Sequence, residues 1–105
     1  MEIQISAKDF SLTESLRRRI ESRIGKLTKY RKDILGATVA LSLEGHRAKG
    51  EKYLADARVM IPGNDVFAKV RAFDMIVAID RMAEKLSRQL QKGKERQTTN
   101  RKSSL

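Results

Sequence analysis

Apolar and polar residues alternate one by one in four short segments of the chain. Residues 2–7, 37–43, 52–61 and 66–73 each show this two-residue period, which is typical of a β-strand with one face buried. The turn-forming residues Pro-Gly-Asn-Asp at 62–65 separate the last two segments. The sequence therefore predicts four strands, and the last three are expected to pair antiparallel because their connections are short.

Two other segments carry apolar residues at the spacing of an α-helix. The first helix is expected to begin at Ser11, which forms a capping box with Glu14, and to end near Tyr30. The second is expected to be capped by Asp74 and to end near Gly93. The predicted apolar stripes are Leu16, Ile20, Ile24 and Leu27 in the first helix, and Met75, Ile79, Met82, Leu86 and Leu90 in the second.

The order of these elements predicts an α+β fold, β-α-β-β-β-α. The first strand returns through a helix and is therefore expected to lie parallel to the second. One face of the four-stranded sheet would bury both apolar stripes, which makes a two-layer sandwich with two helices on one face. Residues 1–93 are expected to form this single domain. Residues 94–105 are basic, lack an apolar period and are expected to form a flexible tail.

The charge of the chain says little about its fold but indicates the kind of partner it binds. The 105 residues carry a formal net charge of +10, which favours a polyanion, with nucleic acid ahead of an anionic membrane surface. No segment is apolar enough to span a bilayer or to act as a signal peptide. Both helices lack the aromatic bulk of membrane-surface helices. A soluble, cytoplasmic protein without membrane contact is therefore expected, and the absence of cysteine is compatible with a reducing cytosol.

The second helix carries a row of cations opposite its apolar stripe. Arg81, Lys85, Arg88 and Lys92 fall within about 60° of one another at about 100° per residue, and no acidic residue shares the row. A solvated helix face explains one such row. The first helix, however, is also biased, with six cations against Glu14 and Glu21: Arg17, Arg18, Arg19, Arg23, Lys26 and Lys29. Two basic helices on one side of a sheet predict a positive groove or ridge for phosphate contacts.

Aromatic residues offer little for reading bases. Phe67, Phe73 and Tyr53 are the aromatics in the predicted strands, and they make a weak stacking platform. Packing is the expected role of Phe67 and Phe73. Recognition is therefore expected to rest on the RNA backbone and its shape.

Catalysis and metal binding find no support in the sequence. His46 is the only histidine, and it has no obvious carboxylate partner. The segment from Gly45 has the glycine spacing of a P-loop, but Glu51 stands where that motif needs lysine. The acids Asp74, Asp80 and Glu84 share a helix with several cations, and pairing within that helix or capping explains them. We therefore expect no enzyme, no cofactor, no metal site and no small-molecule substrate.

Two motifs resemble the ribosome hibernation-promoting and ribosome-associated-inhibitor family. They are "DMIVAID" at 74–80 and "EKLSRQLQKGKER" at 84–96, and "TESLRRRIESRIGKLTKY" is similar to the family's first helix. The resemblance covers about residues 1–96. Ile76 replaces the tyrosine usual in the family. Because the sequence ends at Leu105, without the separate C-terminal domain of long members, the resemblance implies the short form of the family.

The resemblance implies the fold already predicted and a set of partners. It implies binding to the small ribosomal subunit and its rRNA, in the channel for messenger and transfer RNA. Translation would be inhibited by occlusion in stress or stationary phase, and ribosome dimerisation would be promoted or opposed; the sequence leaves open which. The protein is expected to be a monomer away from the ribosome. With Arg81 added from the helical geometry, the predicted RNA-binding residues are Arg23, Lys26, Arg81, Lys85, Arg88, Lys92 and Lys94.

Two alternatives remain at this point. A double-stranded-RNA-binding domain shares the α-β-β-β-α part of the order and reads A-form shape. That family places a lysine cluster at the start of its last helix, whereas here Asp74 stands there and the first cation is Arg81. The other alternative is a non-catalytic interaction module whose charge is incidental.

Overall fold

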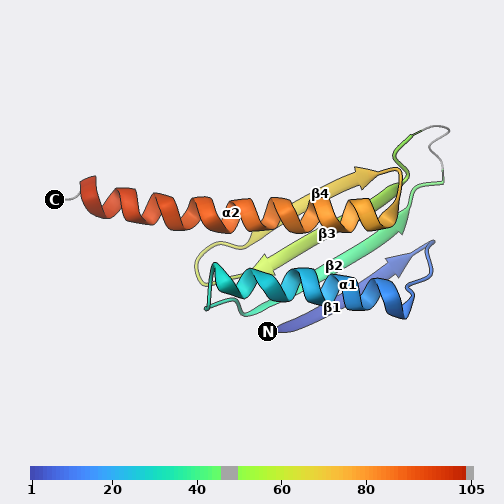
Figure 1. The fold of residues 1–105 in the computed structure, drawn as a ribbon, viewed down its shortest axis with the longest axis horizontal. Coiled ribbons are helices and arrows are strands. Elements are labelled where there is room, and N and C mark those ends of the chain that lie inside the picture. Colours follow the sequence, from blue (N-terminus) through green and yellow to red (C-terminus); the bar gives the residue numbers. More distant parts are fainter. Residues whose placement is uncertain (46–49, 104–105) are drawn as a thin grey trace.

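A computed structural model of the chain describes residues 1–45 and 50–103, with side chains as far as residue 92. The element order is the predicted β-α-β-β-β-α. The elements are β1 (Glu2–Lys8), α1 (Glu14–Gly25), the short 3-10 helix η1 (Lys26–Lys29), β2 (Gly36–Leu43), β3 (Tyr53–Met60), β4 (Val66–Ala72) and α2 (Met75–Ser103). Figure 1 labels the strands and the two long helices.

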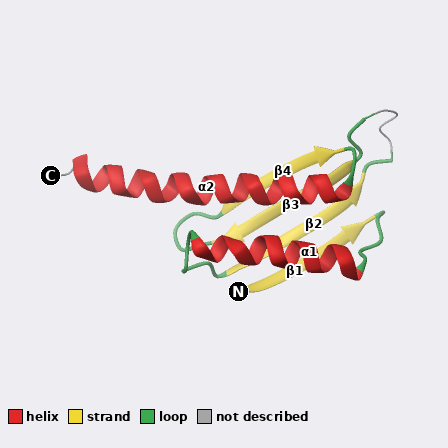
Figure 2. Cartoon of the chain, in the orientation of Figure 1, coloured by secondary structure: helices red, strands yellow, loops and turns green. Residues whose placement is uncertain are grey.

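The four strands form one sheet in the order β1-β2-β3-β4. β1 runs parallel to β2, with Ile5 beside Val39, while β2–β3 and β3–β4 are antiparallel. Both long helices cover the same face of the sheet (Figure 2). The predicted two-layer sandwich is therefore confirmed, including the parallel return of the first strand.

The core lies between the sheet and the helices. Every residue of the stripe predicted for the second helix is buried, and in α1 and η1 Ile20, Ile24 and Leu27 are buried. Below α2, β3 and β4 offer small side chains, including Ala55, Ala57 and Ala68. Large helix residues thus fill the space above small strand residues, which permits the close packing of protein interiors. This packing fixes which face of α2 is left for solvent.

The first helix begins two residues later than the sequence predicts. Thr13 is its N-cap, and its hydroxyl accepts a hydrogen bond from the Leu16 backbone N–H at 3.2 Å. The capping box assigned to Ser11 is therefore wrong. Both residues carry the hydroxyl that caps a helix, and the path of the chain into α1 decides between them. The cap of α2 is confirmed, since Asp74 accepts from the Ile76 N–H at 2.7 Å.

The backbone of α2 remains helical beyond Gly93, where the apolar period stops, and continues to Ser103. This stretch contains lysine, arginine, glutamate and glutamine and no proline, and such residues propagate a helix without an apolar partner. The domain boundary at residue 93 and the flexible tail stay predictions. Within the described residues, no helix is long and apolar enough to cross a membrane.

The face of the sheet away from the helices is uncovered by any described element. Its residues alternate with the core residues, so Phe67, Lys69 and Arg71 of β4 share it. Phe67 is 58% exposed, and Phe73, just beyond β4, is 72% exposed. The predicted packing role of these two rings is therefore wrong, because the period of β4 turns Phe67 to the open face. His46 lies outside the described residues.

Candidate RNA-binding surface

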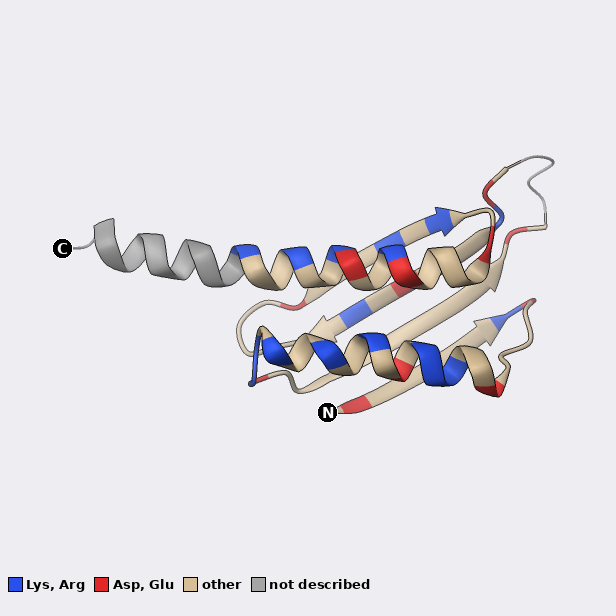
Figure 3. Ribbon diagram, in the orientation of Figure 1, with Lys and Arg blue, Asp and Glu red and all other residues tan. Residues whose placement is uncertain are grey.

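Arg81, Lys85 and Arg88 are held in place by the opposite side of their own helix. Ile79, Met82 and Leu86 are fully buried against the sheet, so the residues about half a turn away must face outward. Figure 3 shows Lys and Arg along both helices and on the neighbouring strands. The three cations follow the flank of α2 that faces β4.

Between this flank and β4 lies a groove of about 440 Å³, which we call the β4-side groove. Its cationic side chains come from two elements, with the acids Glu51 and Glu84 among them. The cations are Lys69, Arg71, Arg81, Lys85 and Arg88. Lys69, Arg81 and Lys85 make no ion pair with any acid in the described part of the chain. They are therefore available to an external anion.

Lys69 and Arg71 are functional candidates that the sequence analysis missed. Both stand on β4, where alternation with Ala68, Val70 and Ala72 shows that they face away from the core. That signal was present in the sequence. No sequence pattern indicated that Lys69 and Arg71 lie close to the cations of α2, because that proximity depends on β4 being the strand beside α2.

The α2 row is less purely basic than its helical spacing suggests. Glu84 stands one turn before Arg88, and its Oε1 accepts from the guanidinium Nη2 at 2.6 Å. Glu84 also lies on the crest of α2, between the β4-side groove and the groove on the other side of the helix. The row of four cations therefore has an acid directly beside it, since residues at i and i+4 meet on a helix.

The basic residues of α1 and η1 lie on the other side of α2. Arg23, Lys26 and Lys29 line a second groove of about 360 Å³ with Asp80 and Glu84, and we call it the α1-side groove. It mixes three cations with two acids, whereas the β4-side groove has five cations with two acids. The two rows predicted for RNA therefore do not form one continuous groove.

Asp80 joins the two helices through a shared ion pair. Arg19 donates Nε and Nη2 to the two carboxylate oxygens at 2.9 and 2.6 Å, and Arg23 approaches with Nε at 3.2 Å. The hydrogen bond from Arg19 holds the pKa of the Asp80 carboxyl below its usual value, against partial burial. Arg23 is thus partly engaged within the protein. Pairing within α2 is confirmed for Glu84, and capping is confirmed for Asp74, whereas the partners of Asp80 lie on α1 instead of its own helix.

Asp80→Asn is expected to change how stability depends on pH. The pKa of Asp80 is lowered in the folded protein, so its charge stabilises the fold above the unfolded pKa and this contribution is lost as pH falls through the folded pKa. The variant should unfold more easily at neutral pH and lose less stability between about pH 5 and 2. Urea unfolding by circular dichroism at several pH values measures both. Parallel curves offset by a constant amount would contradict this role.

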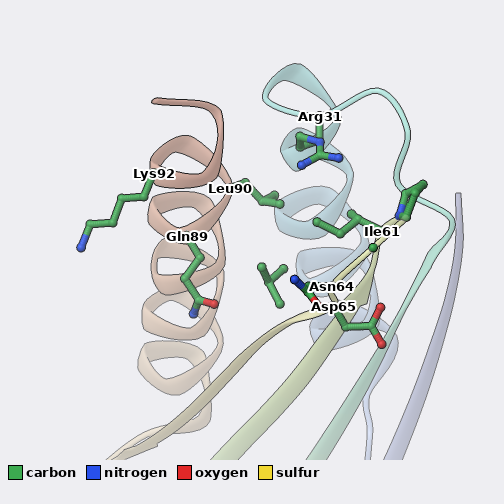
Figure 4. A pocket seen from close by; sticks show the side chains of 10 residues that line it. Arg31, Ile61, Asn64, Asp65, Gln89, Leu90 and Lys92 are labelled. Atoms are coloured by element: carbon green, nitrogen blue, oxygen red, sulfur yellow. The ribbon is translucent and has the colours of Figure 1, made fainter. Parts of the chain in front are cut away.

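Lys92 lies apart from the β4-side groove, at a hollow of about 460 Å³ beside the β3–β4 turn. Figure 4 shows Arg31 directed toward this hollow and the amine of Lys92 directed away from it. Arg31 is held by Asp33 through Nε and Nη2 at 2.8 and 2.6 Å. Lys92 therefore extends the α2 row to its end without sharing the groove, and the side chain of Lys94 lies outside the described residues.

Two features that often mark other kinds of site are absent among the residues that the structure describes. No group of three or more histidine, aspartate or glutamate side chains gathers there to hold a metal. No buried side-chain polar atom in that part of the chain lacks a hydrogen-bond partner.

Comparison with known proteins identifies the family model and the relatives that the chain matches. Residues 3–98 match the family model described as "Sigma 54 modulation protein / S30EA ribosomal protein". The chain is 33% identical over 97 residues to the ribosome hibernation promoting factor of Pseudomonas putida, covering 92% of this chain and 90% of that protein. It is 30% identical over 93 residues to the ribosome hibernation promotion factor of Deinococcus radiodurans, but spans only 49% of that protein and 89% of itself.

A solved structure agrees with these relatives. The crystal structure of the Thermus thermophilus Protein Y N-terminal domain superposes with a TM-score of 0.77 at 28% sequence identity, covering 88% of this chain and 98% of that one. The resemblance seen in the two α2 motifs is thereby confirmed. The chain belongs to the family of the Sigma 54 modulation protein and S30EA ribosomal protein, with the ribosome hibernation promoting factors among its relatives.

Proposed function

We propose that this protein is a ribosome hibernation factor that binds the small ribosomal subunit in its mRNA and tRNA channel. The observation that carries the proposal is the β4-side groove, where five cations from α2 and β4 line one surface of the sandwich. Names of relatives at about 30% identity support a hibernation role. Binding would inhibit translation under stress or in stationary phase.

The mechanism we propose is occlusion without a chemical step. Lysine and arginine in the β4-side groove would contact rRNA phosphates, and the sandwich would occupy the space that messenger and transfer RNA need. The family is one of ribosome-associated factors and is not a class of enzymes. Each neutralised phosphate releases condensed counterion, so affinity should fall steeply with salt, with a logarithmic slope of about −0.7 to −0.9 per contact.

Co-sedimentation tests this function directly. The protein would be mixed with purified small subunits, large subunits or duplex RNA over a series of salt concentrations. Saturable binding to small subunits that resists competition by duplex RNA supports the proposal. Equal binding to all three would identify a duplex-shape reader or a non-specific cation, and binding to none would leave the cations as a solvated face. Sucrose-gradient profiles of the bound ribosomes would then report any effect on dimerisation.

Glu84→Gln is expected to strengthen binding to the small subunit about two- to fivefold at low salt. The substitution removes the carboxylate that holds Arg88 and leaves the amide nearly the same shape, so one more cation becomes available to phosphate. The measurement is the dissociation constant from the same sedimentation assay.

A matched control for Glu84→Gln is available on α1. Glu14→Gln makes the same change of net charge and removes a similar exposed pair one turn apart, with Arg18 at 3.5 Å. It should leave the affinity nearly unchanged, because Glu14 lies outside both grooves. Equal gains from the two substitutions would show that only net charge matters.

A further inference from the structure

The open face of the sheet contains a shallow hollow of about 580 Å³ beside the ring of Phe67. Small residues of β1 and β2 form its floor, with Ser6, Thr38 and Ala40 among its lining. Phe67 stands across the sheet from them, in register with Arg58 of β3. A large exposed ring beside small neighbours leaves room over the sheet for a flat group.

The Phe67 ring is held at the edge of the hollow. The guanidinium carbon of Arg58 lies 5.9 Å from the centroid of the Phe67 ring, within the range of a cation–π contact. Asp65 fixes that guanidinium, because its Oδ2 accepts from Nε at 2.6 Å. Even with Arg58 beside it, Phe67 remains 58% exposed. The ring is therefore placed in advance and still accessible.

Lys69 connects the hollow with the β4-side groove. It follows Phe67 by two residues on the same face of β4, about 6.6 Å along the strand. It also lines the β4-side groove with Arg81 and Lys85. A nucleic-acid strand whose phosphates lie in that groove can thus pass Lys69 and present its next base to Phe67.

We propose that the hollow binds one unpaired nucleobase, stacked on Phe67, of the RNA whose phosphates contact the β4-side groove. This inference rests on the proposed function and adds to it a contact with the base. The side chains of Gln4 and Thr38 line the hollow and carry donors and acceptors that can meet a base edge. Stacking on an aromatic ring with an arginine nearby is how proteins bind single-stranded nucleic acid with little dependence on sequence.

The test compares two RNA probes at low salt, a labelled oligoadenylate of roughly twelve nucleotides and a blunt duplex of the same length. Phe67→Ala should weaken binding of the single strand about tenfold and leave duplex binding unchanged. The dependence on salt should be unaltered, because no phosphate contact is removed. Phe67→Tyr should bind like the wild type, whereas Phe67→Leu, which is apolar but cannot stack, should bind like Phe67→Ala.

Phe73→Ala is the matched control, since that ring is also exposed but lies outside the hollow. It should bind both probes like the wild type. The inference is overturned if Phe67→Ala binds the single strand with the same affinity as the wild type, or if neither protein binds it. The same holds if the substitution weakens binding of the single strand and of the duplex equally. It is also overturned if the wild type is a dimer that Phe67→Ala dissociates. Co-sedimentation of the wild type with small subunits decides the proposed function separately from each of these results.

Discussion

Reversing the charge of Lys85 and Arg88 together is expected to lower affinity for the small ribosomal subunit about a hundredfold at roughly 0.1 M salt. Both side chains lie in the β4-side groove, and each phosphate contact contributes nearly one logarithmic unit of affinity at that salt concentration. The salt dependence should become shallower by the contact of Lys85 and by part of a second, because Arg88 already shares its charge with Glu84. Sedimentation with small subunits over a salt series measures the affinity and the slope in one experiment.

The control for this double substitution must carry the same change of net charge. Arg18→Glu with Lys32→Glu provides it, since both residues are exposed and neither lines a groove next to α2. The affinity of this control variant for the small subunit should fall by less than about threefold. Equal losses in the two double variants would show that the field of the whole protein, rather than the β4-side groove, determines binding. Unchanged affinity in Lys85→Glu with Arg88→Glu would contradict the assignment of the surface.

Leu86→Ala is expected to lower the free energy of unfolding by about 2–5 kcal/mol. Leu86 follows Lys85 directly, yet its side chain is fully buried in the core between α2 and the sheet. Its truncation removes apolar contacts and leaves a cavity that the surrounding side chains fill only in part. Domains of this size are stable by only about 5–15 kcal/mol, so the loss is a large part of the whole. Urea unfolding followed by circular dichroism measures it.

Lys85→Ala, one residue away, is the natural comparison for Leu86→Ala. It should change the free energy of unfolding by less than about 0.5 kcal/mol, because an exposed lysine on a helix makes few contacts. Conversely, Leu86→Ala that remains folded should bind small subunits with nearly the wild-type affinity. A loss of affinity in the folded Leu86→Ala protein would mean that the position of α2, and not only its charge, is sensitive to the core beneath it.

Much of the fold could be predicted because two local periods decide which face of each element is buried. The two-residue period located the four strands, and the helical period identified every buried residue of the stripe on α2. Asp74 was recognised as a cap because its side chain acts within its own turn. Ser11 was chosen wrongly over Thr13 since both offer the same hydroxyl, and only the path of the chain distinguishes them.

Of the candidate site, only the features that depend on local spacing could be predicted. Arg81, Lys85 and Arg88 were placed on one face of one helix by their spacing, and the structure agrees. The residues from other elements that pack beside that helix could not be predicted. Arg19 and Asp80 are 61 residues apart in the chain, and no local pattern indicates that they meet. The role of Phe67 was misjudged for a related reason, because alternation assigns it to a face without saying whether another element covers that face.

The sequence by itself determined the elements, their buried faces, the excess of positive charge and the family resemblance. Only the tertiary structure decided that β4 lies beside α2, which joins Lys69 and Arg71 to the helical row, and that Asp80 divides its charge between two arginines of α1. The physical reason is the distance along the chain over which each effect acts. Periodicity and capping act within a few residues, whereas a groove and an ion-pair network arise where distant segments pack together.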